Sequence, residues 1–325
     1  MIDGFLNILK PPGMTSHDVV SFLRGALREK RIGHCGTLDP QAAGALPICL
    51  GQATRLASYV SLSGKTYYCE MIFGYETDTQ DIWGNTTRLC PGFTGEVDTR
   101  ALSRSFIGEI DQEVPAFSSV KREGKSLHRH AREGRLIEGV TRKITINSLD
   151  FTHFDSESAG FVVDCGSGTY VRALCRDIGR KLDTAAVMAF LVRLRAGSFL
   201  LKDSITLEEI MKRRDEGEAG LRSVIIPKEA ALRDLPSFTV CEADAAKLRQ
   251  GQSVSLPYDT AGLTRPDDSS GTNAPADEAC ESGESRGESH GWVKDADGGL
   301  IAIGRARELR EKAGFVLFKP DKTFA

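Results

Sequence analysis

A single carboxylate, Asp39, lies in a glycine-rich stretch that carries few other groups able to do chemistry. The stretch reads GHCGTLDPQAAGALPICLGQAT over residues 33–54, and no basic residue lies between His34 and Arg55. An aspartate before a proline commonly forms a turn. An unperturbed aspartate has a pKa of about 3.9, so it is also ionised at neutral pH and able to act as a nucleophile or base. The residues alone leave both interpretations of Asp39 open.

Two further stretches place polar and aromatic side chains two residues apart. In GKTYYCEM, Lys65 and Tyr67 share one face of an expected strand, and in GTYVR, Tyr170 and Arg172 do so if the strand before them continues that far. A core tyrosine and a surface arginine would explain the second pair equally well. The glycines before Tyr170 lack the third glycine and the following acid of a dinucleotide-binding fingerprint, which excludes that type of site.

A basic segment, KREGKSLHRHAREGRLIEGVTRK, occupies residues 121–143. It carries eight lysines or arginines against three glutamates, together with two histidines. A solvated helix would account for such a run of charge. The segment follows a proline-containing stretch and lacks a continuous apolar face, which favours a mobile basic loop that closes on phosphate groups.

Composition limits the kind of protein that carries these groups. A chain of 325 residues favours two domains, and 40% hydrophobic residues suffice for a sizeable core. No apolar run reaches the roughly 18 residues of a membrane span, and the N-terminal stretch has no secretion-signal pattern. The eight cysteines form no C-x-x-C pair, which favours a reducing cytoplasm with mostly buried thiols and no metal site.

The elements expected to position these groups are strands and helices in irregular order. Strands are predicted in FLNILK, GKTYYCEMIFGYETDT, KITINSLDFTHFD and AGFVVDCGSGTYV. Helices are predicted in TSHDVVSFLRGALRE, which starts with the capping-box pair Thr15 and Asp18, and in RALCRDIGRKLD and TLEEIMKRRDEG. Because strands and helices do not alternate regularly, the fold class is α+β.

The last third of the chain differs from the rest in composition and charge. Residues 258–290 contain eight acids against two arginines, so the remainder of the chain is net basic although the whole carries a charge of −3. This tract holds almost nothing apolar and is expected to be a disordered acidic insertion. Short alternating stretches on either side of DADGG predict a β-hairpin in a small β-rich domain.

Taken together, these stretches resemble the TruB family of bacterial tRNA pseudouridine synthases. The matching segments are LNILKPPGMTSHDVV, RIGHCGTLDPQAAGALPICLGQATR, GKTYYCEMIFGYETDTQDIWG, QEVPAFSSVKREGKSLHRHAREG and GSGTYVRALCRDIGRKL. The resemblance implies a pseudouridine synthase catalytic domain over residues 1–232, with a mixed, largely antiparallel sheet, flanking helices and an RNA-contacting loop at about 115–143. It also implies a PUA-like RNA-binding β-barrel over 233–320, interrupted at about 258–290.

The family's reaction is the isomerisation of uridine 55 in the TΨC arm of tRNA to pseudouridine. The uracil is flipped out, detached from its ribose, turned, and rejoined through C5. The resemblance therefore implies a cytoplasmic monomer that needs no cofactor, metal, guide RNA, membrane or protein partner, and whose partner is tRNA.

Each site residue is carried over from a matching motif. Asp39 is expected to be the nucleophile and Arg172 its charge partner. Four residues are matched to the pocket that receives the flipped nucleotide: His34, Tyr67, Tyr170 and Leu191. Five residues of the basic segment are expected to contact the RNA backbone: Lys121, Arg122, Lys125, Arg129 and Arg132.

Two other functions stay open at this point. A guide-RNA-dependent synthase of the same superfamily would share the LDP core, although the intact segment that follows QEVPAF favours an autonomous enzyme. An RNA-binding protein that has lost catalysis would not need Asp39, Tyr67, Tyr170 and Arg172 together. Whether Asp39 attacks C1′ of the ribose, attacks C6 of the uracil, or removes a ribose proton also stays open.

Overall fold

The structure is a computed structural model of the chain. It describes residues 2–90, 92–93, 96–122, 124–135, 137, 139–257, 288–309 and 314–324. The chain divides into two compact units, Met1–Ile226 and Pro227–Ala325. Positions 258–287 of the predicted acidic insertion lie outside the described residues. In the part of the chain that is described, no helix is long and apolar enough to cross a membrane.

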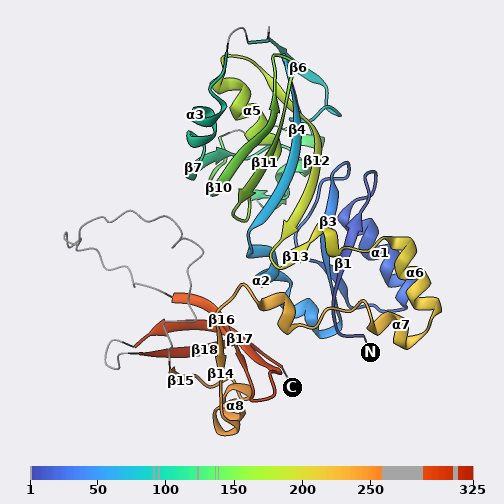
Figure 1. Cartoon of the computed structure of the whole chain (residues 1–325), viewed down its shortest axis with the longest axis vertical. Helices are drawn as coiled ribbons and strands as arrows, with labels where there is room; N and C mark the ends of the chain where they lie inside the picture. Colours follow the sequence, from blue (N-terminus) through green and yellow to red (C-terminus); the bar gives the residue numbers. More distant parts are fainter. Residues whose placement is uncertain are drawn as a thin grey trace. The chain divides into compact units, whose positions relative to one another are not determined.

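The first unit is organised around a nine-stranded sheet (Figure 1). Its main path runs through β1 (Gly4–Lys10), β3 (Ala43–Leu50), β12 (Ala186–Ala196), β4 (Lys65–Phe73), β11 (Ser158–Cys165), β10 (Thr141–Phe154) and β7 (Gly108–Glu113). β2 (Ile32–His34) pairs with β3, and β13 (Phe199–Leu200) pairs with β12. All pairs are antiparallel except β12 with β3. This mixed, largely antiparallel sheet confirms the α+β prediction.

Helices cover both ends of this sheet. The α-helices of the first unit are α1 (Ser16–Leu27), α2 (Ala57–Leu62), α3 (Thr99–Arg104), α4 (Leu127–Arg132), α5 (Val171–Lys181), α6 (Leu207–Asp215) and α7 (Glu218–Arg222). The predicted capping box starts α1: Asp18 N donates to Thr15 Oγ1 at 3.0 Å, and Thr15 N donates to Asp18 Oδ2 at 2.8 Å. The described part of the first unit also contains two 3₁₀ helices, η1 (Gly51–Leu56) and η2 (Leu201–Asp203), whereas a third, η3 (Glu229–Leu232), belongs to the second unit.

The strand predicted over AGFVVDCGSGTYV ends earlier, at Cys165, so it does not continue to Tyr170 and Arg172, and its predicted C-terminal part is wrong. Gly168 adopts a φ of +86°, which breaks the extended backbone. Tyr170 is the N-cap of α5 and Arg172 lies in its first turn. The side chain of Gln112 holds this helix start, because its Oε1 accepts from Tyr170 N at 2.8 Å and its Nε2 donates to Tyr170 O at 3.1 Å.

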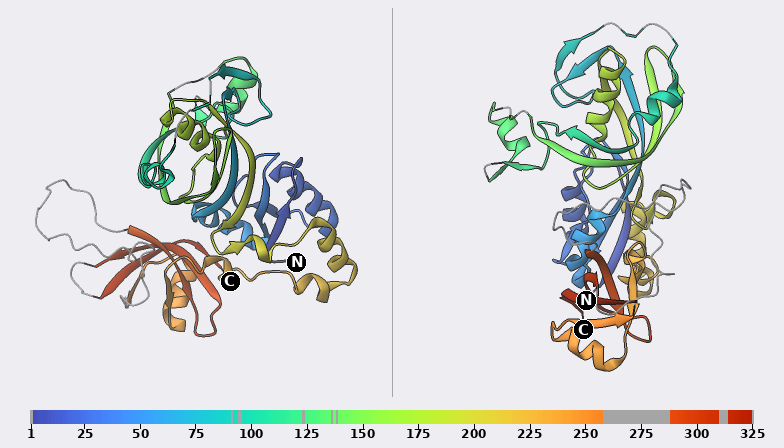
Figure 2. Two further views of the ribbon diagram at one scale, coloured as in Figure 1. Left: turned by 45° about the horizontal axis from the view of Figure 1, so that its top comes forward. Right: turned by 90° about the vertical axis from the view of Figure 1, so that its left-hand side faces the viewer.

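The basic segment is not the irregular loop that the sequence predicted. It contains a short strand pair, β8 (Lys121–Arg122) with β9 (Lys125–Ser126), followed by α4. Figure 2, right, shows α4 and this strand pair standing out from the sheet. Leu127 of α4 is buried with Val114, which precedes the segment, and with Val140 near its end. The apolar face was missed because the residues that form it are far apart in the sequence.

A small hairpin extends the edge of the first unit near β12. It pairs β5 (Tyr75–Thr77) with β6 (Thr86–Leu89), and residues 78–85 form its tip. The tip returns to the main sheet, because Ile82 N donates to Met188 O at 3.0 Å and Met188 N donates to Gln80 O at 3.2 Å. These bonds bring Thr79 and Asp81 next to β12.

The second unit is a small β-rich module. Its five strands follow the order β14 (Ser237–Thr239), β16 (Glu288–Lys294), β17 (Leu300–Glu308), β18 (Phe315–Thr323) and β15 (Val254–Pro257), with one helix, α8 (Glu242–Arg249). Figure 1 shows the sheet curling around itself. The predicted hairpin at DADGG joins β16 and β17. The hydrophobic core of the module includes Phe238, Leu248 and Phe318. This form agrees with the predicted PUA-like barrel.

Candidate active site

Asp39 and Arg172 form an ion pair although they lie 133 residues apart in the chain. Arg172 Nε donates to Asp39 Oδ2 at 2.8 Å, and Nη2 lies 3.4 Å from Oδ1. The other guanidinium contacts are with backbone: Nη1 donates to Thr79 O at 2.7 Å and Nη2 to Phe117 O at 3.1 Å. The Arg172 side chain is 5% exposed, whereas Asp39 keeps 36% of its side chain exposed. The buried Arg172 guanidinium, whose position is fixed by these hydrogen bonds, therefore orients the Asp39 carboxylate, which is still accessible.

Lys10 fixes the backbone that follows Asp39. Its side chain is fully buried, and Nζ donates to Pro11 O at 2.8 Å, Pro40 O at 3.0 Å and Ala42 O at 2.7 Å. Burial lowers the pKa of Lys10 to about 8, and the negative charge of Asp39 opposes that shift. This lysine ends β1, so the first strand of the sheet supports the Asp39 turn.

Arg193 holds the same segment from the opposite side. This fully buried arginine of β12 donates from Nε to Ala45 O at 2.7 Å and from Nη2 to Gly36 O at 3.3 Å. β12 and β3 are parallel at this point, with Arg193 opposite Gly44. A Cβ on Gly44 would lie 2.4–2.9 Å from Arg193 backbone atoms, so the close approach requires glycine.

Tyr67 faces the same region from β4, together with Lys65 as predicted. Tyr67 is 7% exposed, and its side chain lies close to the positive charge of Arg193. Burial raises the pKa of Tyr67, which keeps the ring neutral. Lys65 Nζ donates to Ser61 O at 2.5 Å and Ser63 O at 2.6 Å, and burial, aided by the charge of Arg193, lowers the pKa of Lys65 to about 8.

All of these groups except Lys10 line one cavity of about 620 Å³. Six residues predicted from sequence contribute to its wall, namely Asp39, Tyr67, Arg132, Tyr170, Arg172 and Leu191. Other lining residues were not predicted as pocket residues, among them Lys65, Thr79, Ser118, His128, Arg142 and Arg193. Within the described residues the cavity therefore holds many more cationic than anionic side chains, which suits a polyanionic ligand.

The remaining predicted residues lie elsewhere or have other contacts. His34 belongs to β2 and is not among the residues that line the cavity; burial lowers its pKa. Of the five residues of the basic segment that were predicted to contact RNA, only Arg132 lines the cavity, which His128 and Arg142 of the same segment also line. Lys125 is paired with Glu133 at 3.1 Å, whereas Lys121, Arg122 and Arg129 are exposed.

Sequence reasoning missed Lys10 and Arg193 as parts of the site. Lys10 lies in LNILKPPG and Arg193 in FLVRL, and each is a charged residue that directly follows an apolar run within a strand. That pattern is the signal that could have found them, because a charged side chain inside a buried strand needs polar partners at the site it reaches.

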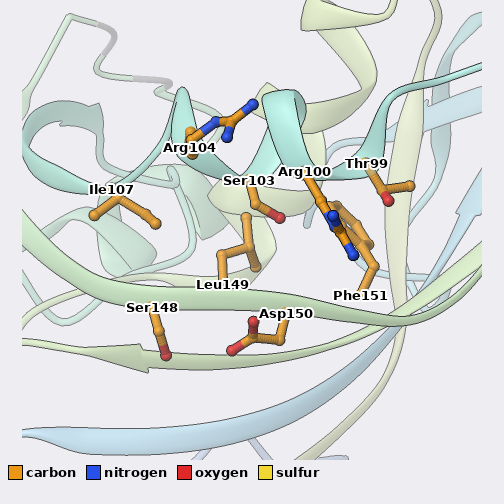
Figure 3. A pocket seen from close by; sticks show the side chains of 9 residues that line it. All are labelled: Thr99, Arg100, Ser103, Arg104, Ile107, Ser148, Leu149, Asp150 and Phe151. Atoms are coloured by element: carbon orange, nitrogen blue, oxygen red, sulfur yellow. The ribbon is translucent and has the colours of Figure 1, made fainter.

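A second hollow of about 440 Å³ lies between α3 and β10 (Figure 3). Arg100 extends beside Phe151, whereas the guanidinium of Arg104 points away from the strand. Both arginines and Asp150 are exposed, and the buried member of the lining is apolar Leu149. This hollow has no fixed, buried polar group comparable to Arg172.

Comparison with known proteins identifies the class of enzyme to which this chain belongs. Residues 24–171 match the model of the TruB family pseudouridylate synthase N-terminal domain, and residues 172–233 match that of the tRNA pseudouridylate synthase B C-terminal domain. The solved structure of a Cbf5–Nop10–Gar1 complex matches with a TM-score of 0.72 and 24% identity, over 99% of this chain and 85% of that chain. Fold and site thus define a pseudouridine synthase.

The curated relatives specify the family. A tRNA pseudouridine synthase B of Heliobacterium mobile is 43% identical over 79% of this chain and 82% of its own length. One of Moorella thermoacetica is 46% identical over 74% of this chain and 79% of its own length. The chain belongs to the TruB family of pseudouridine synthases, which confirms the resemblance seen in the sequence.

Proposed function

We propose that this enzyme converts uridine 55 in the TΨC arm of tRNA to pseudouridine, without a guide RNA. The relatives named tRNA pseudouridine synthase B support tRNA as the substrate. The observation that carries the proposal is the Asp39–Arg172 pair at the wall of a cavity that also contains Tyr67. No other described cavity combines an accessible carboxylate with a buried arginine and a buried aromatic ring.

The target nucleotide has to leave its stack before it can reach Asp39. Flipping costs a few kcal/mol, and stacking on an aromatic ring contributes about 1–3 kcal/mol per base in single-stranded systems. Tyr67 is the ring in the cavity that offers this contact, with Tyr170 and Leu191 as further walls. His34 supports the extruded conformation from β2, and the exposed cations of the basic segment bind phosphates.

The chemical step needs an ionised carboxylate that is close to the nucleotide and held in one orientation. Arg172 holds the Asp39 carboxylate in one orientation beside the cavity, because it donates two hydrogen bonds to Asp39 and is itself fixed by two backbone carbonyls. The C1′–N1 bond breaks, C1′ bonds to C5, C5 releases its proton and N1 gains one. Substrate and product have the same atoms, so the reaction consumes no oxidant or reductant.

The same cavity supports autonomous action. Its wall includes Ser118, His128 and Arg132, so residues 115–143 complete the pocket within one chain. Two of the structural neighbours are titled as H/ACA ribonucleoprotein structures, but at 23–24% identity they are similar in fold alone. We further propose that the second unit, predicted as 233–320, is a PUA-like module that contacts RNA.

The direct test uses the purified protein and an unmodified tRNA transcript. Complete digestion and nucleoside analysis should show one pseudouridine per tRNA, and sequencing should place it at position 55. A product at another position would overturn the target assignment. A requirement for added guide RNA or partner protein would favour a guide-dependent synthase instead.

A further inference from the structure

Ser118 carries a buried hydroxyl without a hydrogen-bond partner in the part of the chain that the structure describes. The residue is 5% exposed and lines the same cavity as Asp39 and Tyr67. Buried hydroxyls are nearly always paired, because an unpaired one loses its contacts with water and gains nothing. An unpaired hydroxyl at a cavity wall therefore indicates a partner that enters the cavity.

The backbone of Ser118 is fixed from two sides. Its carbonyl oxygen accepts from His128 N at 3.0 Å and lies 3.1 Å from His128 Nδ1. The preceding carbonyl, of Phe117, accepts from Arg172 Nη2 at 3.1 Å. Since Arg172 also binds Asp39, direct hydrogen bonds connect the carboxylate to the residue next to Ser118. The hydroxyl thus has a set position relative to the reacting carboxylate.

The chemistry of the cavity indicates which part of the nucleotide this hydroxyl meets. Arg132 and Arg142 are exposed cations at the cavity and are suited to phosphate oxygens. Ser118 is neutral and almost inaccessible, which suits the uncharged base rather than the phosphate. A serine hydroxyl has one donor hydrogen and accepts as well. The uracil edge presents an N3–H donor between the two acceptors O2 and O4.

We propose that the Ser118 hydroxyl binds this O2–N3–O4 edge of the target uracil and holds the base while it is detached from the ribose. This inference rests on the proposed function. When the base turns about the axis through N3 and C6, C5 takes the place of N1, O2 and O4 exchange, and N3–H stays on the axis. A hydroxyl therefore meets the same pattern of donor and acceptors before and after the turn.

The test compares Ser118→Ala with Ser21→Ala. The second variant removes the same hydroxyl from an exposed serine of α1 that does not line the cavity. Single-turnover formation of pseudouridine should slow about tenfold in Ser118→Ala, while the Kd for tRNA stays within about twofold, because one hydrogen bond to the detached base is lost. Ser21→Ala should stay within about twofold of wild type in both measurements. The melting temperature of Ser118→Ala should match wild type, because in the free protein the hydroxyl bonds to no described residue.

A second measurement shows whether the contact is with the base. Transcripts carrying 2-thiouridine or 4-thiouridine at the target position present a weaker acceptor at O2 or O4. The rate ratio of wild type to Ser118→Ala should shrink with at least one of them. An unchanged ratio with both, a wild-type rate for Ser118→Ala, or a lowered melting temperature would each overturn the inference. Failure of the wild-type protein to form pseudouridine would instead refute the proposed function.

Discussion

Asp39 and Arg172 differ in exposure in a way that fits their proposed roles. Arg172 is 5% exposed and bonded to two backbone carbonyls besides the carboxylate, so its position is determined by the fold. Asp39 is 36% exposed and therefore keeps an accessible side toward the cavity. A nucleophile needs this combination of fixed orientation and free access.

Tyr67 should matter more for turnover than for binding. Tyr67→Leu removes a ring that is available for stacking, and we expect the rate at saturating tRNA to fall at least about tenfold while Kd changes less than about threefold. Tyr68→Leu is the matched control, because the adjacent tyrosine points to the other face of β4 and its hydroxyl binds Glu70. Equal losses in rate and affinity for Tyr67→Leu would argue against stacking during the chemical step.

Lys65 should make stability depend on pH in a defined direction. Its folded-state pKa is about 8, below the ordinary 10.5. Between these values the unfolded chain keeps the proton that the folded protein releases, so the free energy of unfolding rises with pH in this window. We expect the stability of wild type relative to Lys65→Met to rise by about 2 kcal/mol between about pH 7 and pH 9.5.

Urea denaturation at the two pH values measures this difference directly. Lys10 is present in both proteins, so its own titration cancels. A stability difference between wild type and Lys65→Met that stays constant or falls with pH would show that burial does not lower the pKa of Lys65.

At the scale of the elements, the close approach of β12 to β3 places the Asp39 turn. Gly44→Ala would force a Cβ within 2.4–2.9 Å of Arg193 backbone. We expect a loss of about 2–4 kcal/mol in stability and a large loss of turnover, because Arg193 would release the carbonyls of Gly36 and Ala45.

Gly134→Ala is the control for backbone strain alone. Gly134 also has a positive φ, +78°, but a Cβ there meets nothing within 4 Å. Only about 1 kcal/mol should be lost in this variant. Equal destabilisation of the two variants, measured by urea denaturation, would contradict the packing argument for Gly44.

Periodicity and capping predicted the elements better than the site. The Thr15–Asp18 capping box and the alternation of β4 are local signals, and both are present in the structure. The start of α5 was predicted within one residue, but the strand before it was predicted too long, because the chain turns at Gly168 and Gln112, 58 residues before Tyr170, holds that turn. Lys10 and Arg193 act on carbonyl groups that are distant in sequence, so no spacing rule indicated their partners.

At the scale of the whole molecule, acid and base are unevenly distributed. The chain carries a net charge of −3, yet residues 258–290 hold eight acids. Cationic side chains gather at the cavity and on the segment from β8 to α4. A net acidic protein can therefore present a basic surface to RNA.

Salt dependence tests this distribution. Replacing Lys121, Arg122 and Arg129 by Gln should weaken tRNA binding and make the slope of log Kd against log salt shallower by about 2, because fewer phosphates are neutralised. Turnover at saturating tRNA should stay within about threefold. A charge-matched control replaces the exposed Lys202, Lys212 and Arg222 by Gln. Equal changes of slope in both variants would contradict a dedicated basic surface.

The role of Asp39 as the reacting carboxylate is tested most directly by the single-turnover rate of Asp39→Asn on an unmodified tRNA transcript. Asparagine keeps the size of the side chain but removes the negative charge. Pseudouridine formation should fall by at least about a thousandfold in this variant, while the Kd for tRNA should stay within a few-fold of wild type. A variant that still forms pseudouridine within about tenfold of the wild-type rate would contradict the assignment of Asp39 as the reacting carboxylate.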